Sequence, residues 1–260
     1  MVLNDILEHK RREVEELKQH LPLSKLARIV EENKEPRRSL YSALSHNRKL
    51  HLICELKKAS PSEGILREEF EPKTLAQEFE AAGASAISVL TEKHYFKGNA
   101  SFLKQIRPFT TIPLLRKDFI FDPYQVYETA ALGADAFLVI TMLFSNEELK
   151  KLLVLARKLK LDTLIEIHTK EELDRALEAG GNIIGINNRD LKTLQIDHAV
   201  SENLIRFIPK EVVTVIESGI ETREEIARFQ ALGANCFLVG TTLMKAKNVR
   251  QKILELCGKY

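Results

Sequence analysis

A ten-residue pattern that joins the end of a helix to the start of a strand occurs four times, and it constrains the fold more than any other feature of the chain. The four copies are AAGASAISVL (81–90), ALGADAFLVI (131–140), EAGGNIIGIN (178–187) and ALGANCFLVG (231–240). Their glycines, at positions 83, 133, 180 and 233, are 50, 47 and 53 residues apart. Because glycine tolerates the left-handed conformation that often ends a helix, each copy predicts a turn from a helix into a strand.

Further apolar strands lie between these joints, and helix starts follow the strands. The S/T-x-x-E capping pattern is formed by Ser145 with Glu148, Thr169 with Glu172 and Thr222 with Glu225, and Pro72 and Pro123 suit the first turn of a helix. Strands are expected near residues 51, 86, 112, 135, 163, 183, 212 and 236. Eight strand–helix units predict an α/β fold, a TIM (β/α)8 barrel. An open doubly wound sheet is the alternative, but the chain lacks the G-x-G-x-x-G and P-loop patterns of many such folds.

We predict a single domain over residues 1–260, made of a barrel at 50–260 and an N-terminal helical extension at 1–49. Apolar residues at helical spacing predict a first amphipathic helix with a solvated face, and a second helix is expected at 23–32. The stripe of the first helix consists of Leu3, Leu7, Val14, Leu17 and Leu21.

The balance of charge argues against several classes of partner. With 39 basic and 37 acidic residues the net charge is only +2, so we expect no nucleic acid and no membrane surface as partner. Cys54, Cys236 and Cys257 lack metal-ligand spacing and are interpreted as reduced packing residues of a cytoplasmic protein.

The first strand carries charges on the face that should be the core. Side chains alternate along a strand, so Ile53, Glu55 and Lys57 share one face and Cys54 lies on the other. Burying two charged groups between covered faces costs several kcal/mol each, which a binding or catalytic site explains better than stability does.

Polar residues also follow the other predicted strands, and in a TIM barrel the carboxyl ends of the strands form the active site. Strand ends contribute Lys117, Glu166, Asn187, Arg189, Glu217 and Ser218. Glu217 is expected to support these groups or to bind a substrate hydroxyl. Asp118, Asp190, His94 and His168 are interpreted as structural.

The turns Ser218–Gly219 and Gly240–Thr241 follow the seventh and eighth strands, where this fold commonly holds a phosphate with backbone N–H groups. A small phosphorylated molecule is therefore the expected partner. Two lysines and two glutamates in one pocket suggest proton transfer on a carbonyl or hydroxyl-bearing substrate. Neither a metal nor redox chemistry is indicated.

Several segments resemble those of the indole-3-glycerol-phosphate synthase family. They are ELKKASPSEG (55–64), LTEKHYFKG (90–98), LRKDF (115–119), LIEIH (164–168), GINNRDLKTL (185–194), ESGI (217–220) and FLVGTTLM (237–244). The resemblance covers essentially the whole chain. It implies a cytosolic lyase of tryptophan biosynthesis that needs no cofactor and closes the indole ring of 1-(2-carboxyphenylamino)-1-deoxyribulose 5-phosphate with loss of carbon dioxide and water.

The resemblance also implies a role for each matching residue. Lys117 is similar to the general acid that protonates the ketone, Glu166 to the general base of the later dehydration, and Lys57 to the lysine that pairs with the substrate carboxylate. Glu55 and Asn187 match groups that orient the ribulose hydroxyls. Phosphate-side positions align with Ser60, Arg189, Ser218, Gly219, Gly240 and Thr241, and the apolar wall around the anthranilate ring aligns with Phe96, Phe119, Leu138 and Leu191.

Three other functions remain open at this point. Phosphoribosylanthranilate isomerase would call for a cysteine base at the first strand end, where this chain has Glu55 and Lys57. A Schiff-base aldolase would use Lys57 or Lys117, and a barrel that only binds a phosphometabolite would not turn it over. A monomer is expected, although no sequence feature fixes the oligomeric state, and the loop at 60–69 is expected to close over substrate.

Overall fold

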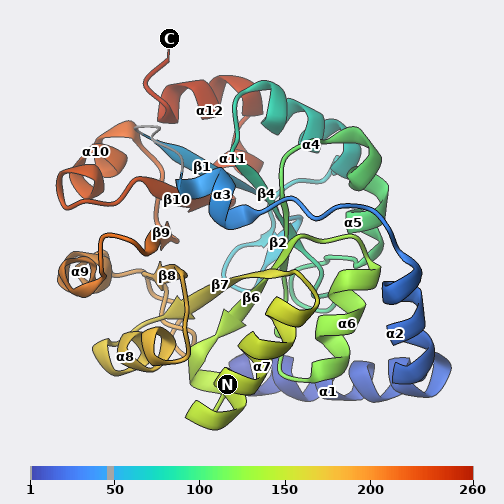
Figure 1. Cartoon of the computed structure of the whole chain (residues 1–260). Coiled ribbons are helices and arrows are strands. Elements are labelled where there is room, and N and C mark those ends of the chain that lie inside the picture. The colour runs from blue at the N-terminus through green and yellow to red at the C-terminus, as the bar shows by residue number, and fades with distance from the viewer. Residues whose placement is uncertain (1, 46–49, 260) are drawn as a thin grey trace.

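Eight parallel strands close into a barrel in the computed structural model, which describes residues 2–45 and 50–259. Around the barrel the strands follow the order β1-β10-β9-β8-β7-β6-β5-β4 (Figure 1). The barrel strands are β1 (His51–Leu56), β4 (Ala86–Leu90), β5 (Leu114–Lys117), β6 (Ala136–Ile140), β7 (Asp162–Ile167), β8 (Ile183–Asn187), β9 (Val213–Glu217) and β10 (Cys236–Val239). Closure confirms the predicted TIM barrel and excludes the open sheet. The boundary predicted at residue 49 lies outside the described residues.

Helices cover the outside of the barrel, as the strand–helix alternation predicts. They are α4 (Pro72–Ala81), α5 (Ser101–Ile106), α6 (Pro123–Ala131), α7 (Asn146–Lys158), α8 (Lys170–Glu178), α9 (Ala199–Leu204), α10 (Arg223–Ala231), α11 (Thr241–Lys245) and α12 (Val249–Leu256). Short 3₁₀ helices follow at Arg107–Phe109, Thr141–Leu143 and Ile205–Phe207. A small hairpin of β2 (Ala59–Ser60) and β3 (Gly64–Ile65) lies in the loop after β1.

Side-chain alternation divides the core into two layers. Leu52, Cys54 and Leu56 of β1 pack outward against the helices, whereas Ile53 packs inside the barrel in another cluster. The same alternation directs Glu55 inward, as its position in the strand predicts.

The expected turn chemistry is present at most joints. The glycines at 83, 133, 180 and 233 all have positive φ, from 81° to 104°. Capping boxes begin α7 at Ser145 and α10 at Thr222. At α8 the side chain of Thr169 accepts a hydrogen bond from the amide of Glu172, and the Glu172 carboxylate accepts one from the amide of His168, one residue before the cap.

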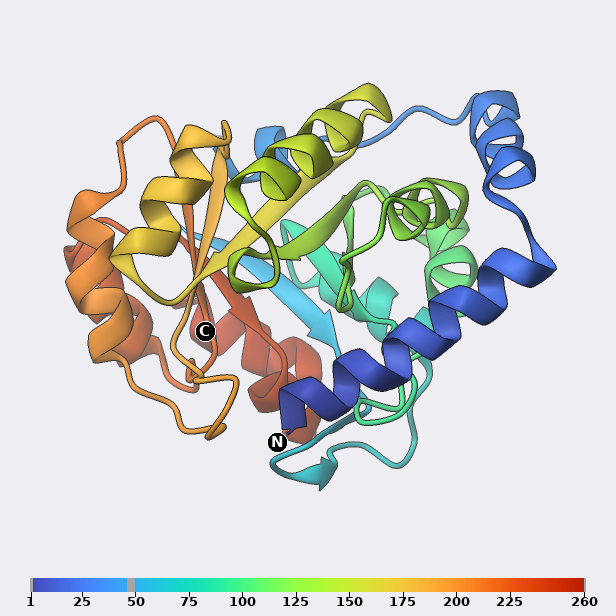
Figure 2. The same cartoon turned by 90° about the horizontal axis from the view of Figure 1, so that it is seen from below.

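The N-terminal extension forms α1 (Val2–His20), α2 (Leu23–Glu32) and α3 (Leu40–Ser45). Figure 2 shows α1 running across the end of the barrel toward which β1 points. Hydrogen bonds from Tyr124 of α6 to the carbonyls of Leu17 and Leu21 hold the end of this helix. The extension therefore packs on the barrel and reaches its mouth.

One charged residue of α1 departs from the predicted solvated face. Lys10 is 3% exposed and its ammonium lies 3.0 Å from Asp118, directly after β5. The carboxylate of Asp118 also pairs with Arg116, and although burial alone would raise its pKa, these cations lower it to about 2.

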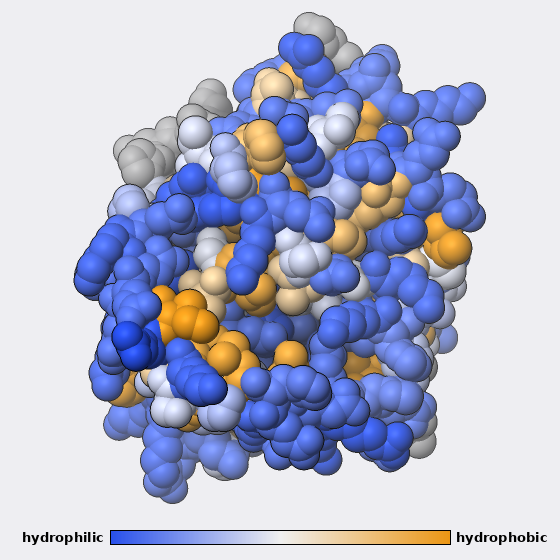
Figure 3. Space-filling model, turned by 90° about the vertical axis from the view of Figure 1, so that its right-hand side faces the viewer, coloured by the Kyte–Doolittle hydropathy of each residue, from blue (hydrophilic) through white to orange (hydrophobic). Residues whose placement is uncertain are grey.

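One face of the molecule is largely hydrophilic (Figure 3), and the thiols are free. On the face in Figure 3, hydrophilic residues predominate and apolar residues form small separate patches. None of the helices within 2–45 and 50–259 combines the length and apolar character needed to cross a bilayer. Cys54 and Cys236 are buried free thiols, and burial raises the pKa of Cys236 to about 12.

Candidate active site

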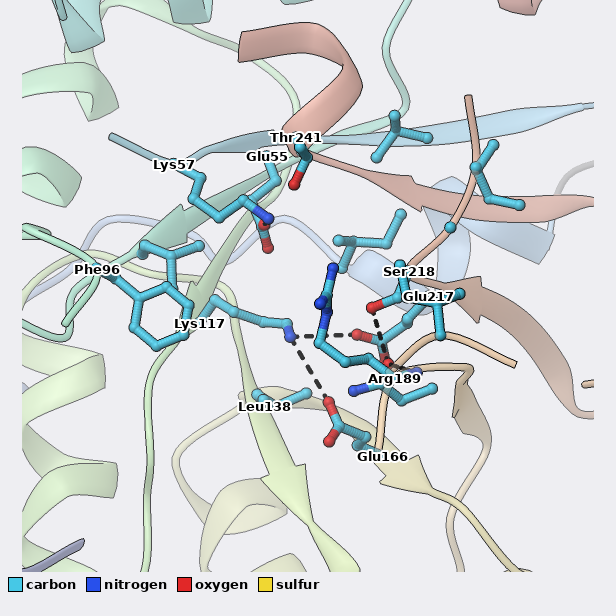
Figure 4. A pocket seen from close by; sticks show the side chains of 18 of the residues that line it. Glu55, Lys57, Phe96, Lys117, Leu138, Glu166, Arg189, Glu217, Ser218 and Thr241 are labelled. Atoms are coloured by element: carbon cyan, nitrogen blue, oxygen red, sulfur yellow. Dashed lines mark hydrogen bonds and ion pairs between the residues drawn. The ribbon is translucent and has the colours of Figure 1, made fainter. Parts of the chain in front are cut away.

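A cavity opens at the carboxyl ends of the strands and is lined by every predicted site residue except Ser60. Glu55 and Lys57 come from the end of β1, Lys117 from β5, Glu166 from β7 and Glu217 from β9. Figure 4 shows these side chains converging from different strands on one space. The other predicted residues that line the cavity are Phe96, Phe119, Leu138, Asn187, Arg189, Leu191, Ser218, Gly219, Gly240 and Thr241.

Ser60 lies in an adjoining cavity, away from the turns after β9 and β10. This second cavity is lined by Leu3 and Ile6 of α1. The residues that line both cavities are Lys57, Phe96, Phe119, Arg189 and Leu191. Ser60 therefore lies beside the aromatic residues Phe96 and Phe119.

Lys117 is the centre of the charged cluster. Its ammonium lies 3.2 Å from Glu217 and 3.6 Å from Glu166 (Figure 4). Burial alone would lower the pKa of Lys117, but the nearby carboxylates of Glu217, Glu166 and Glu55 outweigh that effect and hold it above its ordinary value. Lys117 is therefore protonated at neutral pH.

Glu217 lies beside Lys117 in the cluster and is as buried as Glu166. It is 1% exposed and closer to Lys117 than Glu166 is. Burial and the neighbouring carboxylates raise the pKa of Glu217 to about 7, against the opposing effect of Lys117. Near neutral pH both its protonated and ionised forms are populated, so this group can exchange protons with a ligand.

The pKa of Lys57 is shifted in the opposite direction from that of Lys117. Burial lowers its pKa, and the like charges of Lys117 and Arg189 add to this, although Glu55 lies 3.4 Å away and opposes the shift. Ser88 donates a hydrogen bond of 3.2 Å to the other oxygen of Glu55. Lys57 therefore releases a proton more readily than an ordinary lysine.

Two glycines make room for the buried carboxylates. A Cβ atom on Gly240 would lie 2.4 Å from Oε1 of Glu55, and one on Gly185 would lie 2.0 Å from Oε1 of Glu217. Gly240 thus shapes the cluster as well as the turn after β10. Gly185 was not predicted as a site residue, although a glycine inside a buried strand often marks a close approach.

We expect Gly185→Ala to lower kcat at least about tenfold, because the added methyl group displaces the Glu217 carboxylate from Lys117 and misplaced groups lose catalytic power. Steady-state kinetics of this variant should match those of Glu217→Gln. Gly83→Ala is the matched control, since its φ of 96° strains alanine at a helix end away from the cavity. Loss of thermal stability without loss of kcat is expected there. Wild-type kcat in Gly185→Ala would contradict this explanation.

The turn after β9 has a strained backbone. Ser218 has a φ of 66° and is followed by Gly219 at 79°, and the Ser218 hydroxyl donates a 2.8 Å hydrogen bond to Oδ1 of Asn187. A non-glycine residue in the left-handed region is uncommon and tends to mark functional positions. This turn and Gly240–Thr241 lie on the same wall of the cavity.

An ion pair and hydrogen bonds attach the loop at 60–69 to α11 and the residue after it. Glu63 lines the cavity and pairs with Lys245 of α11, and Arg67 donates to the carbonyls of Met244 and Ala246. Arg189 reaches the same loop at Ser62, 3.4 Å away. These contacts hold the loop over the mouth.

Three of the four residues interpreted as structural have structural partners. Asp118 binds Lys10 and Arg116, Asp190 accepts hydrogen bonds from two backbone amides of its own turn, and the His94 ring stacks on His9. The fourth, His168, lies 3.7 Å from Glu166. No group of three residues able to hold a metal ion is present in the described part of the chain.

Known proteins of one family match almost the whole length of the chain. The family model described as "Indole-3-glycerol phosphate synthase" matches residues 3–256. A protein of that name from Dehalococcoides mccartyi is 46% identical over 259 residues, covering 98% of this chain and 100% of its own length. Another from Acetivibrio thermocellus is 47% identical over 215 residues, covering 83% of each chain.

Solved structures with a similar fold are distant in sequence. A Streptococcus mutans protein named KGPDC has a TM-score of 0.63 at 14% identity, over 81% of this chain and 97% of its own. A tryptophan synthase alpha-subunit from Pyrococcus furiosus has a TM-score of 0.61 at 16% identity, over 80% of this chain and 98% of its own. At these identities the likeness concerns the barrel alone.

Proposed function

Because the chain belongs to the indole-3-glycerol phosphate synthase family and has that family's function in tryptophan biosynthesis, we propose how its cavity performs the reaction. The substrate is 1-(2-carboxyphenylamino)-1-deoxyribulose 5-phosphate, and the enzyme acts as a carbon–carbon lyase in the cytosol. The observation that carries the proposal is the Lys117 ammonium between two buried carboxylates, at 3.2 and 3.6 Å.

Lys117 is the general acid of ring closure. The ring carbon that bears the carboxylate attacks the ketone, and Lys117 protonates the oxygen as negative charge develops on it. The bond to the carboxylate then breaks, its electron pair restores the aromatic ring, and carbon dioxide leaves. The raised pKa of Lys117 keeps the donor fully protonated before the step.

Glu166 is the general base of the dehydration. It removes a proton from the carbon between the nitrogen and the former ketone, while the hydroxyl leaves as water after gaining a second proton. In total the former ketone oxygen gains two protons and leaves as water, whereas Glu166 removes only one proton from the substrate. One proton per turnover therefore comes from solvent when the substrate enters as a carboxylate. Lys57 is a suitable second donor, because departure of the carboxylate removes its counter-ion from a buried position where its pKa is already lowered.

The rest of the cavity binds the substrate. Lys57 pairs with the carboxylate, Glu55 and Asn187 hold the ribulose hydroxyls, and Glu217 shares a proton with them. We assign Ser60 to the aromatic end, beside the wall of Phe96, Phe119, Leu138 and Leu191. The phosphate binds at the opposite wall, at Ser218, Gly219, Gly240 and Thr241, with Arg189 nearby.

Product formation tests this function directly. Purified protein mixed with the carboxyphenylamino substrate should give many turnovers of a fluorescent indole product. Tight binding without product would instead mean a phosphometabolite-binding barrel.

The lowered pKa of Lys57 favours a second candidate, a Schiff-base enzyme, since a neutral amine is the nucleophile in that chemistry. Borohydride added with substrate bound would then trap a covalent adduct on Lys57. We expect no adduct, because the proposed mechanism uses Lys57 as a cation.

We expect removal of the substrate's phosphate to lower kcat/KM by about 10²-fold or more, because binding energy at a remote group contributes to positioning the reacting atoms. The measurement compares the phosphorylated substrate with its dephosphorylated form, and inorganic phosphate should inhibit the former competitively. Equal kcat/KM for the two substrates would reject the phosphate site at the turns after β9 and β10.

A further inference from the structure

The mechanism above does not use His168, a titratable group beside the charged cluster. His168 follows β7 directly and is 17% exposed, and its imidazole lies between two carboxylates. Nε2 lies 3.7 Å from Oε1 of Glu166, and Nδ1 lies 3.6 Å from Oε2 of Glu172. No shorter hydrogen bond to either ring nitrogen is present among the described residues. The ring is therefore placed to interact with both carboxylates as a cation.

The two oxygens of Glu166 face different cations. Oε2 faces the ammonium of Lys117 inside the cavity, and Oε1 faces His168 on the opposite side. Glu166 is 1% exposed, so water contributes little to the stability of its charge. A buried carboxylate needs such partners in order to stay ionised, and a general base has to be ionised to act.

Glu172 fixes the position of this histidine. Its carboxylate accepts a 2.6 Å hydrogen bond from the backbone amide of His168 and also faces the ring. Glu172 thus holds both the backbone and the ring of a histidine behind the base.

The charges around His168 favour its protonated form. Burial alone would lower its pKa, but Glu172, Glu166 and Glu217 outweigh burial and raise it, and Asp190 in the loop after β8 also interacts with the ring. These groups lie on α8, β7, β9 and the loop after β8, and all of them are carboxylates.

We propose that His168 is a positioning residue for the general base, whose imidazolium, held by Glu172, directs the Glu166 carboxylate into the cavity. This inference rests on the proposed role of Glu166. Its consequence depends on the charge of His168: removal of the imidazole lowers activity at a pH where the wild-type ring is protonated and has no effect at alkaline pH, where the wild-type ring is neutral too.

His168→Gln tests the inference. At a pH where wild-type His168 is protonated, kcat of the variant should fall about tenfold, because a misplaced catalytic group loses much of its power. KM should be unchanged, and the two proteins should converge at alkaline pH, where wild-type His168 is neutral. His168→Lys, which keeps a cation, should retain more acid-side activity. Lys170→Gln is the matched control, since it removes an exposed cation two residues away on the outer face of α8.

A double variant decides whether His168 acts through Glu166. In a Glu166→Gln background, His168→Gln should cause no additional loss. An equal fractional loss at every pH, an undiminished loss in the double variant, or a wild-type profile for His168→Gln would overturn the inference. If His168→Gln does not fold, Glu172→Gln should also lower kcat at a pH where wild-type His168 is protonated, and wild-type kcat there would overturn the inference. Wild-type turnover in Glu166→Gln would instead reject the proposed role of Glu166 as general base.

Discussion

Lys117→Ala is expected to lower kcat by about 10²-fold or more, because it removes the positioned proton donor of the first step. The loss should not be confined to one side of the pH–rate profile, since no other ammonium lies between Glu166 and Glu217 among the described residues. Steady-state turnover followed by indole fluorescence measures it. Wild-type kcat would mean that another group protonates the ketone.

Lys117→Arg separates proton donation from charge. The guanidinium keeps a cation between the carboxylates but does not release a proton near neutral pH, so its kcat should remain close to that of Lys117→Ala. Lys104→Ala, an exposed lysine of α5, is the control and should keep wild-type kcat. Recovery of activity in Lys117→Arg would show that the cation alone is required.

Glu166→Gln is expected to lower kcat by a similar factor, about 10²-fold or more, because the amide occupies the same space but does not accept the proton. KM should change little, since the substrate contacts proposed above involve other residues. Glu171→Gln, which changes an exposed carboxylate in the first turn of α8, is the matched control. A large rise in KM with unchanged kcat would assign Glu166 to binding rather than to proton transfer.

The barrel could be predicted from the sequence because its signals are local. A glycine that ends a helix and an alternating strand each need only a few neighbouring residues, and the positive φ of Gly83 and the inward direction of Glu55 follow from such patterns. The active-site cluster could be predicted because closure of eight parallel strands brings their carboxyl ends together.

Interactions between distant segments could not be predicted in this way. Lys10 and Asp118 are 108 residues apart, and neither shows in its own neighbourhood that it pairs with the other. One signal was nevertheless present: Lys10 lies three residues after Leu7 and four before Val14, within the apolar stripe of α1 rather than on its charged face. A charged residue in such a stripe predicts a buried partner.

The central role of Glu217 and the room left by Gly185 depend on register between strands. Gly185 pairs with Val215 in the β8–β9 ladder, and Glu217 lies two residues further on. Side chains that point into a barrel meet neighbours from several strands, so their spacing follows from closure and not from any one segment.

The central claim is that Lys117 and Glu166 act in different steps of one reaction, and the release of carbon dioxide measured against the appearance of indole tests it most directly. In a single turnover, Glu166→Gln should release carbon dioxide before the indole product forms, because ring closure proceeds and dehydration stalls. Lys117→Ala should delay both equally. If carbon dioxide and indole instead appear together at the same slowed rate in Glu166→Gln, the assignment of acid and base to separate steps is wrong.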